Sequence, residues 1–423
     1  MKITKKVILG SMSIMSVLTL AACSSGSSKN TSSGKQTIEV FSTKTENAAT
    51  LKKLAADFHK ENPNITVNVT APADGGTVLK TRLTKNNIPD VISGGGDATF
   101  LELAKANVLE DLSNQEFIKE LQTPYLKAVT SMYGSSKIYG VPYATNASGI
   151  VYNKDIFAKY NIEAPKTWDE FTKAIGVLKS NGVTPLELGF QGADNWTTMC
   201  IWNSVAPSLQ PSDFATKIKE NKTTFTKDMK PVTQKFLDVI DYGQNNFMGK
   251  SYNDTLSDFA SGKSGMIING SWTVPVIRQT NPKINFGLIP FPTTNDATKN
   301  KLSSGVDVLL AVGKNSSHKD ADKKFVSFMM KKENATKYIN EQVAFSAVKG
   351  VEQTDPAMVS VKDYIAKGDV TDYPDHLYPA GFQMAGILSQ LSLNKTKGMS
   401  DSSNISQFLK TADQQYQTAN TSK

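Results

Sequence analysis

Residues 37–69 are TIEVFSTKTENAATLKKLAADFHKENPNITVNV, and the alternation within them sets the class of fold. Residues 37–42 predict a strand. The apolar residues that follow recur at the spacing of one helix face: Leu51, Leu54, Ala55 and Phe58. Pro63 ends this helix, and residues 65–69 predict a second strand. A strand, a helix and a strand in this order indicate an α/β fold with a largely parallel sheet.

The same alternation continues along the chain. Residues 90–93 and 306–312 predict buried strands. Thr167 and Glu170 have the spacing of a capping box at the start of a helix, and Gly182 ends that helix. The apolar face of the helix is formed by Phe171, Ile175 and Leu178, with Trp168 expected in the core. With 423 residues, the chain is long enough for two α/β domains.

The N-terminus predicts an export signal over residues 1–22. Three lysines precede an apolar run over residues 7–22: Lys2, Lys5 and Lys6. The run ends in Leu-Ala-Ala before Cys23, which resembles a bacterial lipobox, whose cysteine is acylated and becomes the new N-terminus. An ordinary secreted protein or an uncleaved anchor helix are the alternatives, although the run is too short to span a bilayer comfortably. Residues 24–36 contain no apolar side chain and predict a flexible linker after Cys23.

Composition excludes several classes of function. The formal net charge of +8 falls to +5 once the three signal lysines are removed, and no basic block interleaved with aromatic residues predicts nucleic-acid binding. The three histidines have no partner at a metal-ligand spacing, so we expect no metal site and no cofactor: His59, His318 and His376. Cys200 lies in an apolar context that favours a buried structural thiol. No nucleophile elbow, P-loop or dinucleotide fingerprint is present, although a glycosidase needs only two carboxylates.

Four segments resemble the extracellular solute-binding proteins of carbohydrate ABC transporters. They are FHKENPNITV at 58–67, PDVI at 89–92, GIVYNKDIF at 149–157 followed by PKTWDEF at 165–171, and FASGKSGMIINGSW at 259–272. The last two are the specific pair. Residues 366–370 and 378–382 are similar to the multiple-sugar or raffinose-type receptors of that family.

The resemblance implies a two-lobed periplasmic-binding-protein-like fold of type II, in which each lobe is a mostly parallel sheet flanked by helices. Hinge strands then cross near residues 145–148, near residues 286–291 and after a helix ending near Glu333. Lobe one would comprise residues 37–146 plus 288–332, and lobe two residues 147–287 plus 333–423. A ligand would close the lobes by bridging them.

Aromatic residues in the resembling segments are candidates for stacking on a sugar. Trp272 follows a predicted strand at a position where the family places a stacking tryptophan; the alternative is a core tryptophan. Trp196, in the segment Asp194-Asn195-Trp196, is the second candidate. Tyr378 and Phe382 are further candidates, with plain helix packing as their alternative.

Polar candidates follow the ends of predicted strands. Thr43 and Glu46 lie after the first strand, in a family contact region. Asp97 follows Gly94-Gly95-Gly96 and is either a ligand carboxylate or a helix N-cap. Asn146 stands where some relatives have a contacting Glu, which puts its role in doubt. Asp307 is polar at the edge of a predicted buried strand.

The resemblance thus predicts a non-enzymatic, monomeric receptor that captures an oligosaccharide. Its partners would be membrane permease subunits and, through them, a cytoplasmic ATPase. The lipid on Cys23 would hold it at the outer face of the membrane of a Gram-positive bacterium. A tethered glycoside hydrolase and a receptor for a peptide, a polyamine or iron remain the alternatives.

Overall fold

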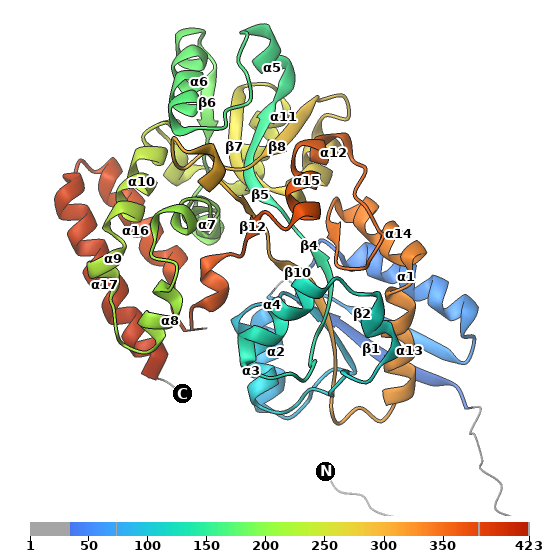
Figure 1. Cartoon of the computed structure of the whole chain (residues 1–423). Helices are drawn as coiled ribbons and strands as arrows, with labels where there is room; N and C mark the ends of the chain where they lie inside the picture. Colours follow the sequence, from blue (N-terminus) through green and yellow to red (C-terminus); the bar gives the residue numbers. More distant parts are fainter. Residues whose placement is uncertain (1–33, 73, 380, 422–423) are drawn as a thin grey trace, which may run out of the picture. The chain divides into compact units, whose positions relative to one another are not determined.

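Two six-stranded sheets organise the computed structural model, which describes residues 34–72, 74–379 and 381–421 (Figure 1). The predicted signal, Cys23 and nearly all of the predicted linker lie outside the described residues. The chain divides into two units, residues 1–34 and residues 35–423, and both sheets belong to the second. Among the described residues no helix has the length and apolarity needed to cross a membrane.

The first sheet and its helices form what we call the first lobe. Its strands, in spatial order, are β11(Phe345–Ser346), β4(Val141–Thr145), β10(Val306–Val312), β3(Val91–Gly94), β1(Gln36–Ser42) and β2(Ile65–Thr70). Its helices are α1(Ala48–Glu61), α2(Gly75–Thr84), α3(Ala98–Lys105), α4(Thr123–Tyr133), α13(Lys319–Met329) and α14(Lys332–Gln342).

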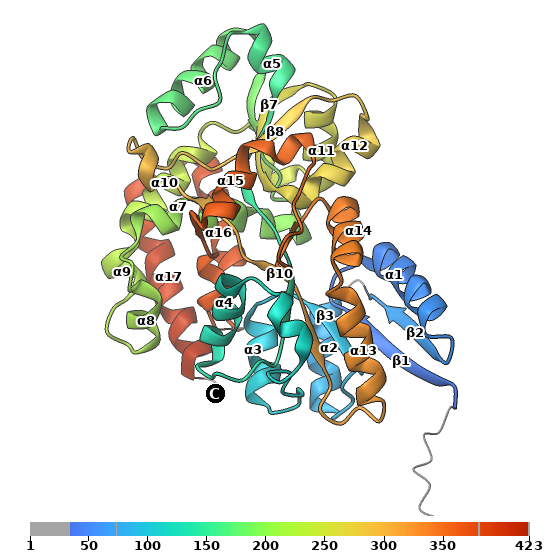
Figure 2. The ribbon, with the colours of Figure 1, turned by 45° about the vertical axis from the view of Figure 1, so that its right-hand side comes forward.

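The second sheet and its helices form the second lobe. Its strands are β12(Val370–Thr371), β9(Leu302–Ser303), β5(Ser148–Asn153), β7(Ser264–Gly270) and β6(Thr184–Glu187), with β8(Phe286–Ile289) also paired to β5. Its helices are α5(Lys154–Lys159), α6(Trp168–Ser180), α7(Thr198–Leu209), α8(Phe214–Lys219), α9(Phe225–Asp228), α10(Lys230–Ile240), α11(Tyr252–Ala260), α12(Val274–Thr280), α15(Val359–Lys367), α16(Met384–Thr396) and α17(Asp401–Thr421). The last two run side by side at the edge of this lobe (Figure 2).

Local sequence signals account for the helices. The α1 face predicted from Leu51, Leu54, Ala55 and Phe58 is buried, and the helix ends at Glu61, just before Pro63. The capping box of α6 is present, because the Thr167 hydroxyl accepts from the Glu170 N–H and the Glu170 carboxylate accepts from the Thr167 N–H. Gly182 then adopts a φ of 71°, which a side chain would disfavour. These predictions are confirmed.

The α/β class is confirmed, but the expectation of mostly parallel sheets is wrong. In the first sheet β1 pairs in parallel with β2 and β3, whereas β10 runs antiparallel to both β3 and β4. In the second sheet β5 is antiparallel to β7, β8 and β9. Parallel neighbours need a crossover connection, as α1 supplies between β1 and β2. β10 and β5 enter their sheets directly from the other lobe, without such a crossover. Each runs antiparallel to the strands beside it.

The chain passes from one sheet to the other at residues 146–147, between β4 and β5. It returns at residues 304–305, between β9 and β10, later than the expected 286–291 because β8 and β9 still pair within the second sheet. It passes over again after β11, beyond the expected position near Glu333, because α14 still packs on the first lobe. The lobe limits expected at residues 288 and 333 therefore shift toward the C-terminus.

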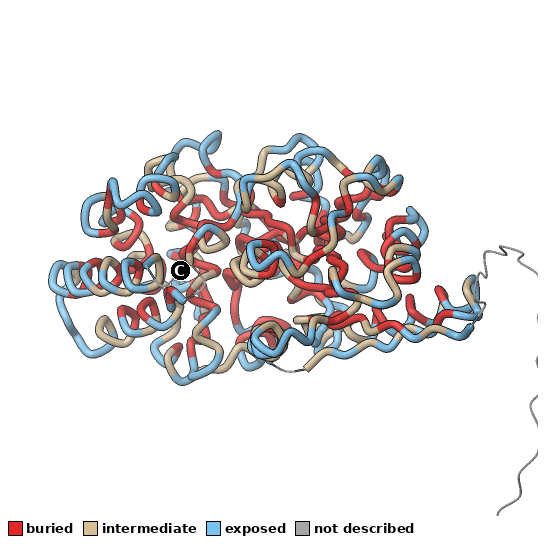
Figure 3. The backbone as a smooth tube through the Cα atoms, turned by 90° about the horizontal axis from the view of Figure 1, so that it is seen from below, coloured by how far each residue is buried: buried red, intermediate tan, exposed pale blue. Residues whose placement is uncertain are grey.

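A large apolar core lies in each lobe, and buried residues lie toward the interior while exposed ones lie toward the outer surface (Figure 3). In the first lobe Phe58 of α1 packs edge-on against Phe325 and Phe328 of α13. In the second lobe Trp168, which was expected in the core, is half-buried and packs from the edge against the core residues Phe171 and Phe291.

One buried carboxylate makes the stability of the first lobe depend on pH. Asp322, in the first turn of α13, has no solvent-exposed surface, and neither of its side-chain oxygens has a hydrogen-bond partner within the part of the chain that the structure describes. Burial raises the pKa of Asp322 to about 6, and the neighbouring charge of Asp90 adds to the effect. The proton is therefore held more tightly in the folded protein than in the unfolded chain. This group favours folding below pH 4 and loses that contribution as the pH rises through 6.

We expect Asp322→Asn to raise the free energy of unfolding at pH 8 by about 1–2 kcal/mol and to leave it nearly unchanged at pH 4. The amide keeps the shape of the carboxyl but cannot ionise. Urea unfolding at both pH values measures the effect. Asp320→Asn, on the same helix turn but exposed, is the control and should give no such gain. An Asp322→Asn protein whose stability follows the wild-type pH profile would contradict the expectation.

Candidate functional site

The ends of β1 and β3 bring two predicted contact regions together in the first lobe. Ser42 and Ser93 are register partners, and the Thr43 N–H donates to the Ser93 carbonyl at 2.9 Å. The loop after β1 therefore lies beside the loop that leads to Asp97. The Thr43 side chain lies 3.1 Å from where a Cβ on Gly94 would be.

The glycines at 94–96 make room for the protein's own atoms. A Cβ on Gly95 would lie 3.1 Å from the Asp97 carboxylate, and one on Gly96 would lie 3.0 Å from the Val306 side chain. In the structure the space beside them is taken by Thr43, Asp97 and Val306.

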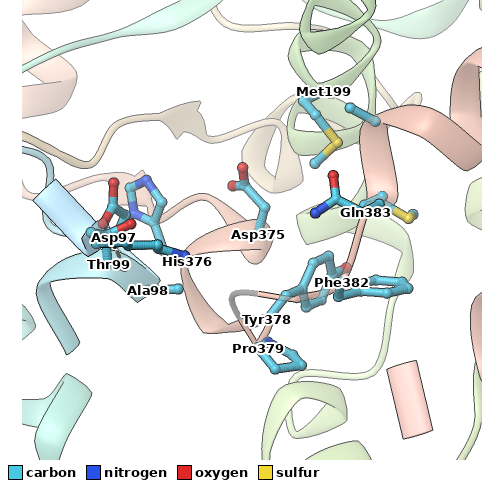
Figure 4. Close-up of a pocket in the computed structure, with 13 residues that line it drawn as sticks. Asp97, Ala98, Thr99, Met199, Asp375, His376, Tyr378, Pro379, Phe382 and Gln383 are labelled. Atoms are coloured by element: carbon cyan, nitrogen blue, oxygen red, sulfur yellow. Dashed lines mark hydrogen bonds between the residues drawn. The ribbon is translucent and has the colours of Figure 1, made fainter. Parts of the chain in front are cut away.

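Asp97 caps α3 and also lines cavities. Its Oδ1 accepts from the backbone N–H groups of Thr99 (2.8 Å) and Phe100 (3.2 Å). The residue lines a cavity of about 270 Å³ between the lobes, where it lies beside His376 in Figure 4. The cap and the site were alternatives in the sequence, and the geometry allows Asp97 to serve both.

A half-buried polar network joins the lobes where the chain crosses. The Asn146 amide donates to Asp307 Oδ1 at 3.0 Å, and the Tyr373 hydroxyl donates to Asn146 Oδ1 at 2.7 Å. The Lys44 ammonium also donates to Asp307 Oδ1 and lies 3.7 Å from Glu46. Burial alone would lower the pKa of Lys44, but the charges of Asp307 and Glu46 raise it, so this lysine stays a cation.

Trp272 lies at the same place, in the short 3₁₀ turn η4(Ser271–Thr273) that follows β7. A Cβ on Gly270 would lie 2.0 Å from the indole ring, so only glycine allows the ring to cover this backbone. The ring packs on the edge of the second-lobe core, and its Nε1–H has no hydrogen-bond partner among the described residues. A buried donor without a partner is costly unless something else accepts from it.

Four of the predicted residues share one small inter-lobe cavity of about 20 Å³: Glu46, Asn146, Trp272 and Asp307. Thr43 lies with Asp97 in an adjoining cavity of about 40 Å³ in the first lobe. Tyr378, Phe382 and Asp97 line the 270 Å³ cavity. The structure thus brings most of the predicted residues to the space between the lobes.

The Asp194-Asn195-Trp196 segment is placed differently. Trp196 lies in η2(Gly192–Thr197) with 37% of its surface exposed, and its ring centroid is 5.1 Å from that of Tyr252. Asp194 accepts from the Tyr252 N–H at 2.8 Å, and the Asn195 carbonyl accepts from the Thr198 hydroxyl at 2.7 Å. Asp194 therefore holds the start of α11. None of these three lines the cavities described above.

Tyr378 and Phe382 are buried in an aromatic cluster of the second lobe. They are 5% and 8% exposed, and both rings pack against Phe225 and Tyr416. The Trp202 Nε1–H donates to the Tyr378 hydroxyl at 3.2 Å. Both residues also line the 270 Å³ cavity, together with Met199 of α7 and Gln383 (Figure 4).

Sequence analysis missed the pair Asp375 and His376, which extend into the same cavity (Figure 4). His376 Nδ1 lies 2.9 Å from Asp372 Oδ1. Burial would lower the pKa of His376, but the hydrogen bond to Asp372 and the charges of Asp372, Asp375 and Asp97 raise it to about 9. Asp375 accepts from the Asn203 amide at 2.9 Å, and burial raises its pKa. The only signal was the mixture of charges and rings in residues 372–376.

Cys200 of α7 is buried, as predicted, and burial raises the pKa of its thiol to about 12. A thiol that stays protonated at neutral pH is a poor nucleophile.

The site as a whole combines rings, carboxylates, amides and hydroxyls in fixed positions. These groups suit the recognition of a polar, uncharged molecule with apolar faces.

Known proteins are similar to this chain in sequence and in fold. Residues 42–336 match the family described as bacterial extracellular solute-binding protein. The multiple sugar-binding protein of Streptococcus mutans is 35% identical over 364 residues, which cover 84% of this chain and 85% of that one. The melibiose/raffinose/stachyose-binding protein MelE of Bacillus subtilis is 25% identical, with 86% and 85% covered. The structure of RafE in complex with raffinose has a TM-score of 0.73 and 26% identity, with 90% of this chain and 99% of that one covered.

The family match covers more than half of the sequence, and the relative from Streptococcus mutans aligns along most of both chains. The two-lobed fold and the polar inter-lobe site agree with that match. The chain belongs to the family of bacterial extracellular solute-binding proteins.

Proposed function

We propose that this protein is the sugar receptor of an ABC importer, which captures an oligosaccharide of the raffinose or multiple-sugar type between its lobes and delivers it to a membrane permease. The observation that carries the proposal is the placement of Trp272. Its unpartnered indole N–H and its ring lie at the cavity that Glu46, Asn146 and Asp307 also line. The relatives named for raffinose, stachyose and multiple sugars support the same class of ligand.

Sugar recognition requires two kinds of surface. The C–H faces of a pyranose ring pack on aromatic rings, and its hydroxyls pair with planar polar groups that accept and donate. Trp272 supplies the ring, while Glu46 and Asn146 supply acceptors and donors. Because these groups come from both lobes and from the crossing between them, a bound sugar contacts all three at once.

Lobe closure follows from that arrangement. The lobes are joined by the short crossings at 146–147 and 304–305 and by the segment after β11. A few residues at strand ends can absorb the change in backbone angles. A ligand that contacts both lobes binds the closed form better than the open form, and this difference drives closure.

Anchoring and delivery complete the proposal. Cys23 would carry the lipid that holds the protein at the outer membrane surface, and residues 24–36 would give it reach. Permease subunits would contact the outer faces of both lobes, and a cytoplasmic ATPase would supply the energy. The protein itself would perform no reaction, act as a monomer and belong to a Gram-positive cell.

The first test is a ligand screen on the purified protein. A thermal-shift series from mono- to tetrasaccharides should find sugars that raise the melting temperature, because saturation at 100-fold over Kd stabilises the folded state by about 2.7 kcal/mol. Small-angle scattering with the best sugar should show compaction. Chromatography should recover the sugar intact, whereas shorter products would support a glycoside hydrolase. The proposal fails if no sugar in the series changes the melting temperature.

A pair of tryptophan variants tests the site. Trp272→Ala should weaken binding of the identified sugar by at least about tenfold, or about 1.4 kcal/mol, because the stacking ring and the N–H donor are both lost. Trp168→Ala is the matched control. Trp168 packs on Phe171 and Phe291 with the Lys235 ammonium 3.5 Å from its ring centroid, so its loss should lower stability by about 2–4 kcal/mol and leave affinity unchanged. Titration calorimetry and urea unfolding measure both. Wild-type affinity in Trp272→Ala would remove this ring from the site.

A pair of cysteine variants tests the anchor. Cys23→Ser should release the protein from cells into the medium, because the serine lacks the thiol that would carry the lipid anchor. Uptake of the cognate sugar at low concentration should then fall. Cys200→Ser, which changes a buried thiol, should leave the protein on the cells. Fractionation by immunoblot and radiolabelled uptake are the measurements. Retention of Cys23→Ser on the membrane would argue for an uncleaved N-terminal helix.

A further inference from the structure

A larger groove opens beside the site. It encloses about 1180 Å³ and is lined by residues of α2 and α3 in the first lobe and of the C-terminal helix α17 in the second. Figure 1 labels these three helices. Ordinary small-molecule pockets range from about 300 to 1,000 Å³. The groove is therefore roomier than a site for a mono- or disaccharide needs, and most of the residues that line it do not line the cavities described so far.

The groove continues the cleft. The 270 Å³ cavity and the groove have five lining residues in common: Lys80, Ala98, Tyr378, Pro379 and Gln383. Ala98 is the first residue of α3, directly after Asp97, and it lines both spaces on the first-lobe side. A ligand that emerges from beside Asp97 and His376 therefore meets the groove next.

The walls of the groove offer the same two kinds of surface as the cleft. Leu101 of α3 and Leu377, which is 49% exposed, present apolar surface from opposite lobes. Polar groups alternate with them: Glu102, which lies 3.5 Å from the Lys80 ammonium, and Gln414 and Gln415 of α17. Large exposed apolar residues among amides and charged groups suit a ligand with C–H faces and many hydroxyls.

We infer that this groove is an extension of the binding site that holds the further units of an oligosaccharide whose first units occupy the cleft. The inference rests on the proposed function. Because α3 and α17 belong to different lobes, each unit in the groove adds contacts that depend on the lobes being together. Longer homologues of one sugar series should therefore bind more tightly.

The test is a chain-length series on the intact protein: raffinose, stachyose and the next longer α-galactosyl homologue. In the wild-type protein we expect calorimetric affinity to rise by at least about threefold with each added unit. Thr84→Trp places a large side chain in the groove from the exposed end of α2. It does not touch the cleft, because Thr84 lines the groove but not the 270 Å³ cavity. It should leave raffinose affinity unchanged and abolish the gain with length. Thr81→Trp, exposed on the same helix and outside the groove lining, is the control and should retain the gain.

A second pair covers the opposite wall. Leu377→Ala should reduce the gain with length, and Val359→Ala, which removes a 55% exposed apolar residue from α15, should not. Raffinose binding without any gain in the wild-type protein, or an undiminished gain in Thr84→Trp, would overturn this inference while the proposed function stands. Failure of every member of the series to bind would overturn both.

Discussion

The contact between residues 146 and 305 is the constraint on which the two lobes depend. Here two crossings of the chain run side by side, with the Asn146 N–H donating to the Gly305 carbonyl at 3.3 Å. A Cβ on Gly305 would lie within 2.9 Å of atoms of Asp372, Tyr373 and His376, so no other residue fits without displacing that segment. The C-terminal segment that forms part of the cleft wall is thereby seated directly on the crossing.

The charges of the cleft are arranged so that its polar groups are held before a ligand arrives. Lys44 is shared between Asp307 and Glu46, and His376 is held by Asp372. Fixed side chains lose little conformational freedom on binding, which favours affinity. Both cations are also compensated by neighbouring carboxylates, which favours ligands recognised through hydroxyl groups over ligands recognised through charge.

The sequence predicted what depends on near neighbours. The α1 face, the Thr167–Glu170 capping box and the burial of Cys200 follow from residues within a few positions of one another, and each is present. Strand direction could not be predicted, because β10 is antiparallel only as a result of where the chain re-enters the first sheet.

The same limit applies to the site. Residue types and the family resemblance were enough to select Glu46, Asn146, Trp272 and Asp307, which lie together at one cavity. Burial lowers the pKa of His376, but Asp372 mainly raises it, with smaller contributions from Asp375 and from Asp97, which is far away in the sequence. The position of the ring depends on how residues 372–376 fold against Gly305. Likewise, the sequence of Gly94 to Gly96 does not indicate that Thr43 and Val306 will occupy the space those glycines leave.

The position of β10 in the chain has a consequence for how the protein is made. This strand lies in the middle of the first sheet, between β3 and β4, yet it follows the residues of nearly all the second sheet. Val306 pairs with Thr145, so the first lobe cannot complete its sheet until the second has largely been synthesised. Contacts this distant in sequence slow folding. During synthesis, the earliest segments of the chain therefore cannot close into a finished domain before the later ones have emerged.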